Sequence, residues 1–331
     1  MKDDNIKRLI VKASEWKDSP EDFISTGILP LDIALVRGGY RRGRLVEIFG
    51  KEHTGKTLTT MLALIWDQKI NKRKSLFVDA EGSFNVAWFE QMGGNLDLLD
   101  VYDPYQGTEI YGEIVYDNVI KLIETGEYAF TVLDSLMGSA LLSNEILDKT
   151  IDSTKRMGID AKLNKQFFRR AFIVTSQTST TLLITNHVVD NIGVMFGSKE
   201  TTPGGSDLKF RAEQRLRISS PKEKNEFGHR SEIKIIKNKR GASAGKKIDF
   251  MFNYNYGVDN FEEMAKLMVK KGLIPKKDKK SYYNSINGNY EEYEKNRLML
   301  LDLNEKDLLQ ATEEYEDEIV STNYEEDDFQ E

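Results

Sequence analysis

Residues 50–57, Gly-Lys-Glu-His-Thr-Gly-Lys-Thr, limit what this chain can fold into more than any other stretch. They fit the pattern of glycine, four residues, glycine, lysine and serine or threonine that binds nucleotide phosphates. Residues 44–49 form a short apolar run suited to a buried strand, and residues 58–70, rich in Leu, Met and Ala, suit a helix. A strand, loop and helix in this order point backbone N–H groups and a helix N-terminus at one anion, so a nucleotide site is predicted here.

Within this loop we expect Lys56 to reach the β- and γ-phosphates of ATP and Thr57 to coordinate Mg²⁺. The other residues expected to line the nucleotide are Gly50, Lys51, Glu52, His53, Thr54, Gly55 and Leu58. The alternative is a glycine-containing turn that matches the pattern by chance. The predicted strand and helix on either side favour the nucleotide site.

Length and composition set the class of protein. A chain of 331 residues suffices for one substantial domain with smaller attachments. It has no cysteine and three histidines, which excludes disulfides and thiolate zinc sites and leaves Mg²⁺ as the expected metal. There is no apolar run long enough for a membrane span and no leader-like start, so a cytoplasmic protein without membrane contact is expected.

Charge is divided unevenly along the chain. The formal net charge is −7, but residues 311–331 contain ten Asp or Glu and no Lys or Arg, and without them the chain carries +3. A weakly basic body with an acidic tail suggests a polyanion partner and a segment that competes for the same surface. A disordered tail that only aids solubility is the alternative.

Three further strands are expected to end in polar residues. Residues 75–80 lead into Glu81, residues 128–134 end in Asp134, and residues 180–187 end in His187. In open α/β sheets ligands lie beyond the carboxyl ends of the strands. We therefore expect Glu81 to orient or deprotonate the attacking water, although a surface role is the alternative, and Asp134 to hold Mg²⁺ opposite Thr57.

Two helices offer candidates for ligand contact. Residues 84–92 carry Trp88, which has a flat face for adenine but equally suits core packing. The helix expected over 155–172 places Lys162, Lys165 and Arg169 on one face. That face suits a nucleic acid backbone, with a merely solvated basic face as the alternative.

The long segment after His187 contains the apolar residues Ile192, Met195 and Phe196, which suit either contact with nucleic acid bases or burial in a core. Three alternating strands follow, over 214–219, 232–237 and 247–253. The second ends in a basic cluster at 237–240, which suits nucleic acid or a phosphoryl group.

The chain is expected to divide into four parts. These are a short amphipathic N-terminal helix within 1–22, a core over 23–257, a small helical domain over 258–310, and the acidic tail 311–331. The N-terminal helix is too short to fold alone, so it packs on its own core or docks on a neighbouring subunit.

Several segments in order resemble the RecA family of recombinases, and they are most similar to the shorter phage-encoded members of the UvsX type. The matching segments are 24–27, 31–35, 50–57, 78–81, 133–135, 192–197, 200–205, 208–210 and 237–239. The resemblance spans about residues 23–275. It implies an α/β fold: a RecA-type P-loop ATPase core with a mostly parallel central sheet flanked by helices, a short N-terminal helix and a small α-rich C-terminal domain.

The resemblance also implies roles for individual residues. Glu81 matches the family's water-activating glutamate, and His187 stands where bacterial members carry a glutamine that senses the γ-phosphate and phage members carry histidine. Trp88 matches an aromatic residue that stacks on adenine. The positions implied for DNA binding are Lys162, Arg169, Ile192, Met195, Phe196, Gly204 and Gly205, and those implied for the subunit interface are Phe210, Lys237 and Lys239. The two lysines would reach the neighbour's nucleotide.

The implied function is ATP-dependent DNA recombination. Such a protein hydrolyses ATP to ADP and phosphate, forms a helical filament on single-stranded DNA, and pairs it with double-stranded DNA for strand exchange in recombination, repair and replication. Single-strand-binding and loading proteins are the implied partners, in the cytoplasm of a bacterium or of a phage-infected host. The alternatives are a hexameric DNA helicase with the same core and an ATP-gated structural protein that coats single-stranded DNA.

Overall fold

A computed structural model describes residues 22–107, 111–136, 156–190, 200–219, 225–241 and 243–303, together with Ile10, Lys12 and Ser19. Most of the predicted N-terminal helix and all of the acidic tail lie outside these residues, and so do Ile192, Met195 and Phe196. Within the described ranges, no helix has the length and apolar character needed to cross a lipid bilayer.

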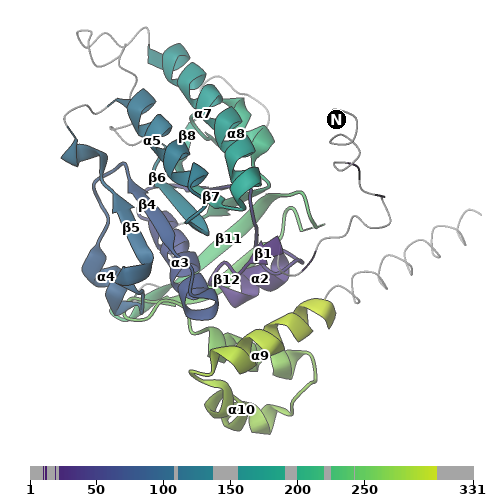
Figure 1. Ribbon diagram of the computed structural model, residues 1–331. Helices are drawn as coiled ribbons and strands as arrows, with labels where there is room; N and C mark the ends of the chain where they lie inside the picture. Colours follow the sequence, from purple (N-terminus) through teal and green to yellow (C-terminus); the bar gives the residue numbers. More distant parts are fainter. Residues whose placement is uncertain are drawn as a thin grey trace, which may run out of the picture.

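An eight-stranded sheet forms the centre of the molecule, in the order β12-β11-β10-β3-β7-β6-β4-β5 (Figure 1). The six strands from β10 to β5 run parallel, and β11 and β12 join antiparallel at one edge. The strands of this sheet are β3 Leu45–Gly50, β4 Ser75–Asp79, β5 Leu99–Tyr102, β6 Phe130–Asp134, β7 Thr181–His187, β10 Gln214–Ile218, β11 Gly228–Asn238 and β12 Lys247–Asn253. Two small sheets pair β1 Phe23–Ile24 with β2 Tyr40–Arg41, and β8 Val189–Asp190 with β9 Glu200–Thr201.

Helices cover both faces of the large sheet, because its central strands are apolar on both sides. In β7, Leu182 and Ile184 pack on one face and Leu183 packs on the other, as the two-residue period of a strand requires. Helix α3 lies on the second of these faces, and α5 and α7 lie together on the first (Figure 1). The helices are α2 Leu29–Ala34, α3 Lys56–Asn71, α4 Val86–Gln91, α5 Gly112–Glu124, α7 Arg156–Thr178, α8 Ser206–Arg211, α9 Asn260–Lys270 and α10 Lys279–Ile286, with a further helical stretch over 290–303.

The last helices form a separate cluster below the sheet and pack on α3 through aromatic rings (Figure 1). The ring of Trp66 on α3 contacts Phe261, Tyr290 and Tyr293, with ring centroids 5.0 to 6.2 Å apart. Tilted and edge-on contacts of this kind are favourable for aromatic rings. The helical cluster is therefore anchored to the core at the far end of α3 from the phosphate loop.

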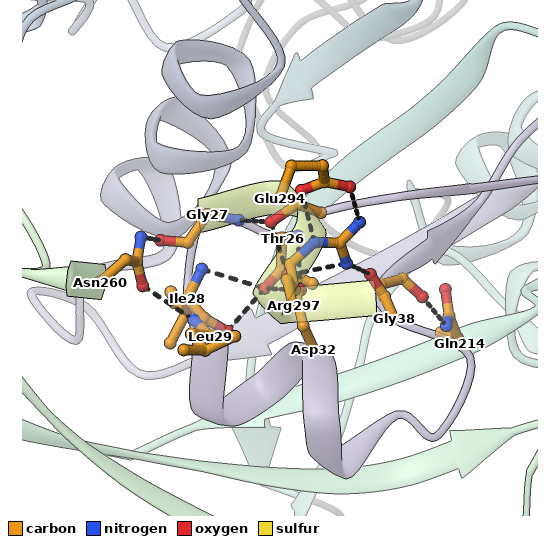
Figure 2. Close-up of polar contacts among 12 residues, drawn as sticks. Thr26, Gly27, Ile28, Leu29, Asp32, Gly38, Gln214, Asn260, Glu294 and Arg297 are labelled. Atoms are coloured by element: carbon orange, nitrogen blue, oxygen red, sulfur yellow. Dashed lines mark hydrogen bonds and ion pairs between the residues drawn. The ribbon is translucent and has the colours of Figure 1, made fainter. Parts of the chain in front are cut away.

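A buried ion pair joins the same two parts of the chain (Figure 2). Arg297 lies 3.6 Å from the carboxylate of Asp32 on α2 and donates to the Gly38 carbonyl at 2.8 Å and to Glu294 at 2.5 Å. Asp32 also accepts hydrogen bonds from the hydroxyl groups of Ser25 and Thr26 and from the Thr26 N–H. Both charges are almost completely buried, so each depends on the partners that surround it.

Asn260, the first residue of α9, adds a third link. Its amide group donates to the Gly27 carbonyl and accepts from the Leu29 N–H, both at 2.9 Å (Figure 2). One side chain thus satisfies two backbone groups at the start of α2, which would otherwise be buried without partners.

The elements expected around the phosphate loop lie within a few residues of their predicted bounds. The elements that were not predicted include β5, a short edge strand, and α5, which packs against α7. Helix α7 continues to Thr178, beyond the predicted end at 172, because Val174 and Thr175 are buried against the core. Strand β11 is also longer than predicted, since its first half pairs with β12 from Gly228 onward.

Candidate functional site

Four neighbouring parallel strands bring the predicted nucleotide-site residues together. Strands β3, β7, β6 and β4 lie side by side and end at the same edge of the sheet. The phosphate loop follows β3, His187 ends β7, Asp134 ends β6, and Glu81 comes two residues after β4. These side chains lie close together because parallel strands present their carboxyl ends to the same side.

The phosphate loop requires glycine at two positions. Gly55 precedes α3 with φ of 95°, a left-handed conformation that other residues rarely adopt. At Gly50, a Cβ atom would lie 2.4 Å from the carbonyl oxygen of Ile218, so a side chain does not fit. Lys56 is buried, and its ammonium donates to the Lys51 carbonyl at 3.0 Å. Burial lowers the pKa of Lys56, against the opposing effect of the Asp134 and Glu81 carboxylates.

A hydroxyl and a carboxylate lie beside this lysine. Thr57 donates its hydroxyl hydrogen bond to Asp134 at 2.5 Å, and Thr185 donates to the other oxygen of Asp134. Burial raises the pKa of Asp134, although both hydrogen bonds act in the opposite direction. Mg²⁺ prefers hard oxygen ligands of these types. The pair of Thr57 and Asp134 therefore fits the metal predicted for this site, and a bound cation would remove the cost of burying the carboxylate.

Glu81 is held by two side chains from the neighbouring strand ends. Ser135 donates a short hydrogen bond to Oε1 of Glu81, and His187 Nε2 lies 3.0 Å from the same oxygen. Burial pushes the pKa of Glu81 upward, but the hydrogen bonds with His187 and Ser135 outweigh it, so the pKa lies below its usual range. Glu81 is consequently ionised at neutral pH and able to accept a proton.

Trp88, the residue predicted to stack on adenine, lies on α4 and packs against the hydrophobic cluster that α3 covers. Trp88 on α4 donates from Nε1 to the Tyr254 carbonyl at 2.9 Å and meets Phe252 edge-on at 6.3 Å. It is partly buried, so a portion of the ring remains accessible. Its role in adenine binding stays a prediction.

The residues predicted for the subunit interface cluster at the end of α8. The side chain of Phe210 is 74% exposed, unusually open for a large aromatic residue. Lys237 donates to the carbonyls of Lys209 and Phe210 at 2.7 and 2.9 Å, and Lys239 donates to the Arg211 carbonyl at 3.3 Å. Cations are favourable where the last carbonyls of a helix lack partners. Within one chain, these lysines thus contact α8.

The structure describes four of the residues predicted to bind DNA, namely Lys162, Arg169, Gly204 and Gly205. Lys162, Lys165 and Arg169 are all exposed on α7, whose opposite side buries Phe168. Gly204 has φ of 92°, and a Cβ there would lie 2.5 Å from Leu136. The neighbouring Gly205 immediately precedes α8. The apolar residues at 192, 195 and 196 lie outside the described residues, and DNA contact stays a prediction for the whole set.

Two residues of the candidate nucleotide site were not predicted from the sequence. Ser135 directly follows Asp134, so its position beside the site was available, but its contact with Glu81 depends on β4 and β6 being neighbours. Thr185 lies inside an apolar strand and contacts Asp134 only because β7 pairs with β6. No local pattern marks either contact.

Together, the fold and the phosphate loop define a P-loop α/β protein with a candidate nucleotide site at the carboxyl edge of its sheet. The sequence matches the family model of the RecA N-terminal domain over residues 4–259. The RecA proteins of Leptospira biflexa and Enterococcus faecalis are 36% and 33% identical over 278 and 277 residues, covering 82% of this chain and 68% and 76% of their own lengths. The chain belongs to the RecA family.

The solved structures include a similar fold. The crystal structure of the RadB recombinase superposes with a TM-score of 0.54 at 20% sequence identity, covering 71% of this chain and 98% of that one. At this identity the match concerns the fold alone. It confirms the expected RecA-type core with a mostly parallel central sheet flanked by helices.

Proposed function

We propose that this chain is an ATP-dependent DNA recombinase of the phage-encoded UvsX type. It forms helical filaments on single-stranded DNA and catalyses homologous pairing and strand exchange with double-stranded DNA, in the cytoplasm and with single-strand-binding and loading proteins as partners. The observation that carries the proposal is the meeting of Lys56, Thr57, Glu81, Asp134 and His187 at four adjacent strand ends. Membership of the RecA family supports it.

The side chains suit hydrolysis of ATP to ADP and phosphate. Glu81 accepts a proton from a water molecule whose oxygen attacks the γ-phosphorus, while the bond from that phosphorus to the bridging oxygen of ADP breaks. Lys56 stabilises negative charge on the phosphates. Thr57 and Asp134 would hold Mg²⁺, which would supply further neutralisation of the phosphate charge. His187 contacts Glu81, and we assign it the role of detecting the γ-phosphate.

The C-terminal end of α8, together with the two lysines that contact it, provides the contact between subunits. Phe210 is exposed for packing against a neighbour, and Lys237 and Lys239 lie beside it to reach the neighbour's nucleotide. Such a head-to-tail interface, when it does not close into a ring, extends into a helical filament. Nucleotide buried between subunits makes that filament depend on ATP.

The first experiment measures ATP hydrolysis with and without single-stranded DNA and examines the same samples by electron microscopy. DNA-stimulated hydrolysis together with long helical filaments is the expected result, and it would justify a strand-exchange assay. Stimulated hydrolysis with closed rings would instead indicate a hexameric helicase. Filaments without turnover would indicate a structural DNA-coating protein.

Filament assembly is expected to weaken as the pH rises through 8. Burial, together with the charges of Lys239 and Arg215, lowers the pKa of Lys237 to about 8. The charged form that attracts a neighbour's phosphate is therefore present below pH 8 and lost above it. Because one pH unit changes the charged fraction up to about tenfold, assembly with a non-hydrolysable ATP analogue should fall about five- to tenfold between pH 7.5 and 9.

Light scattering across this pH range measures the effect. Lys237→Arg keeps its charge throughout and should remove most of the pH dependence, whereas Lys266→Arg on the exposed side of α9 should leave it unchanged. An identical pH profile in wild type and Lys237→Arg would contradict the role assigned to Lys237.

Removing residues 311–331 is expected to tighten binding to single-stranded DNA. The truncation deletes ten acidic residues that compete with DNA phosphates for the basic surface. The gain should be severalfold at low salt and shrink as salt screens the charges. Fluorescence anisotropy of labelled DNA measures it, with a control in which the ten acidic residues are replaced by their amides. Unchanged affinity at low salt would assign the tail to solubility alone.

A further inference from the structure

Each of residues 200–203 accepts a hydrogen bond from the side chain of another residue. Glu200 accepts from Arg217 at 2.5 Å and lies 3.8 Å from the ammonium of Lys51. The remaining contacts are Lys209 to Thr201 at 2.6 Å, Arg215 to Thr202 at 3.3 Å and Asn186 to the Pro203 carbonyl at 3.1 Å. This segment, which we call the clamp segment, includes β9 and leads into α8.

The inner half of the clamp segment is fixed to the strand that carries the phosphate loop. Arg215 pairs with the fully buried Glu47 of β3 at 2.5 Å, and its guanidinium lies 4.8 Å from the ring centre of Phe49. Asn186 donates to the same Glu47 at 2.9 Å. Buried and fully paired groups of this kind form a rigid support. Thr202 and Pro203 therefore have a fixed position relative to β3.

The outer end of the clamp segment is held differently. Side-chain exposure is 27% for Glu200, 36% for Arg217 and 68% for Lys51. The contact with Arg217 is a short charge-assisted hydrogen bond, whereas the contact with Lys51 is long and exposed, and so weak. Lys51 belongs to the phosphate loop itself. A nucleotide phosphate and the Glu200 carboxylate would thus compete for the same ammonium group.

The clamp segment is also paired with the strand that follows His187. In the small sheet, Val189 lies opposite Thr201 and Asp190 opposite Glu200. His187, two residues before Val189, contacts Glu81. The two strands β8 and β9 therefore reach the nucleotide site at separate points, one through His187 and Glu81, the other through Glu200 and Lys51.

We propose that Glu200 is a positioning residue that couples nucleotide binding to DNA binding through Lys51 and Arg217. Without nucleotide, Lys51 and Arg217 share Glu200. With nucleotide, Lys51 turns to the phosphates while Arg217 keeps its hydrogen bond to Glu200, so the attachment of the start of β9 differs between the two states. This inference rests on the proposed function, in which ATP controls the affinity for DNA.

The test compares the affinity of the full-length protein for single-stranded DNA with and without a slowly hydrolysed ATP analogue. The ratio of the two affinities, measured by fluorescence anisotropy, is the coupling. Glu200→Gln should lower the coupling at least about fivefold, the lower end of typical coupling factors. It should also bind the analogue about two- to threefold more tightly, because the competitor for Lys51 is weakened.

Further variants separate coupling from simple loss of structure. Arg217→Gln should lower the coupling as Glu200→Gln does, and the double variant should be little worse than either, because both remove the same pair. Glu124→Gln, at an exposed position on α5, is the matched control and should behave as wild type. The melting temperatures of all four should agree within a few degrees.

Two results would overturn the inference while leaving the proposed function standing. One is an unchanged coupling in Glu200→Gln. The other is a parallel loss of coupling, analogue affinity and melting temperature, which would assign Glu200 to structure alone. If the wild-type protein binds DNA with the same affinity with and without the analogue, that result would contradict the proposed function itself, and the inference with it.

Discussion

Glu81→Gln is expected to stop ATP turnover while preserving ATP-dependent binding to DNA. Glutamine keeps the size of the side chain and an oxygen that can accept from Ser135, but it cannot take a proton from water. General bases contribute about 10²- to 10⁴-fold to enzymatic rates, so hydrolysis should fall at least about a hundredfold. The nucleotide and metal contacts proposed for Lys56, Thr57 and Asp134 do not involve this proton transfer, so filaments should still form.

The measurement is steady-state phosphate release with saturating single-stranded DNA, alongside electron microscopy of the same samples. Glu90→Gln, an exposed carboxylate on α4, is the matched control and should hydrolyse ATP at the wild-type rate. Normal hydrolysis by Glu81→Gln would show that another group activates the water. Loss of filaments together with turnover would show that Glu81 is needed for assembly.

Arg297→Met is expected to destabilise the native state by about 3–5 kcal/mol, the usual cost of leaving one partner of a buried ion pair alone. The substitution removes the guanidinium beside Asp32 and the hydrogen bond to the Gly38 carbonyl (Figure 2). Urea denaturation followed by circular dichroism measures the free energy of unfolding. Lys295→Met, an exposed change on the same helical stretch, should alter it by no more than about 0.5 kcal/mol.

The effect of Arg297→Met should depend on pH. Burial raises the pKa of Asp32 from 3.8 to about 6, and Arg297 opposes that rise. Removing Arg297 therefore moves the folded-state pKa still further above the unfolded value. A raised folded-state pKa means that the native state binds the proton more strongly, so the penalty is present at pH 8 and relieved as pH falls. The difference from wild type should be smaller at pH 5.5 than at pH 8.

A second variant separates charge from shape. Asp32→Asn combined with Arg297→Met removes both charges, so it should recover a large part of the lost stability and show little of the pH dependence. Equal stability losses for Arg297→Met at both pH values would show that lost packing, not an unpaired carboxylate, carries the effect.

Local patterns were sufficient to predict the elements next to the candidate nucleotide site. The glycines at 50 and 55 and the apolar run before them define a loop with few alternatives, and β3 and α3 lie where that pattern places them. Asp134 was predictable because an apolar strand ending in a carboxylate is informative once a phosphate loop precedes it. By contrast, β5 was missed because its exposed edge position, with Asp100 and Val101, breaks the apolar run expected of a parallel strand.

The sequence alone was enough to predict the chemical groups of the candidate nucleotide site: a lysine and a threonine in a phosphate loop, a carboxylate at each of two strand ends, and a histidine at a third. These depend on residue type and short spacing, which local physics controls. The tertiary structure decided which groups meet. Thr185 contacts Asp134, Ser135 contacts Glu81, and Arg297 bonds to Gly38 across 259 residues of chain. Such contacts follow from the order of strands and the docking of helices, since both depend on burying apolar surface between segments distant in sequence.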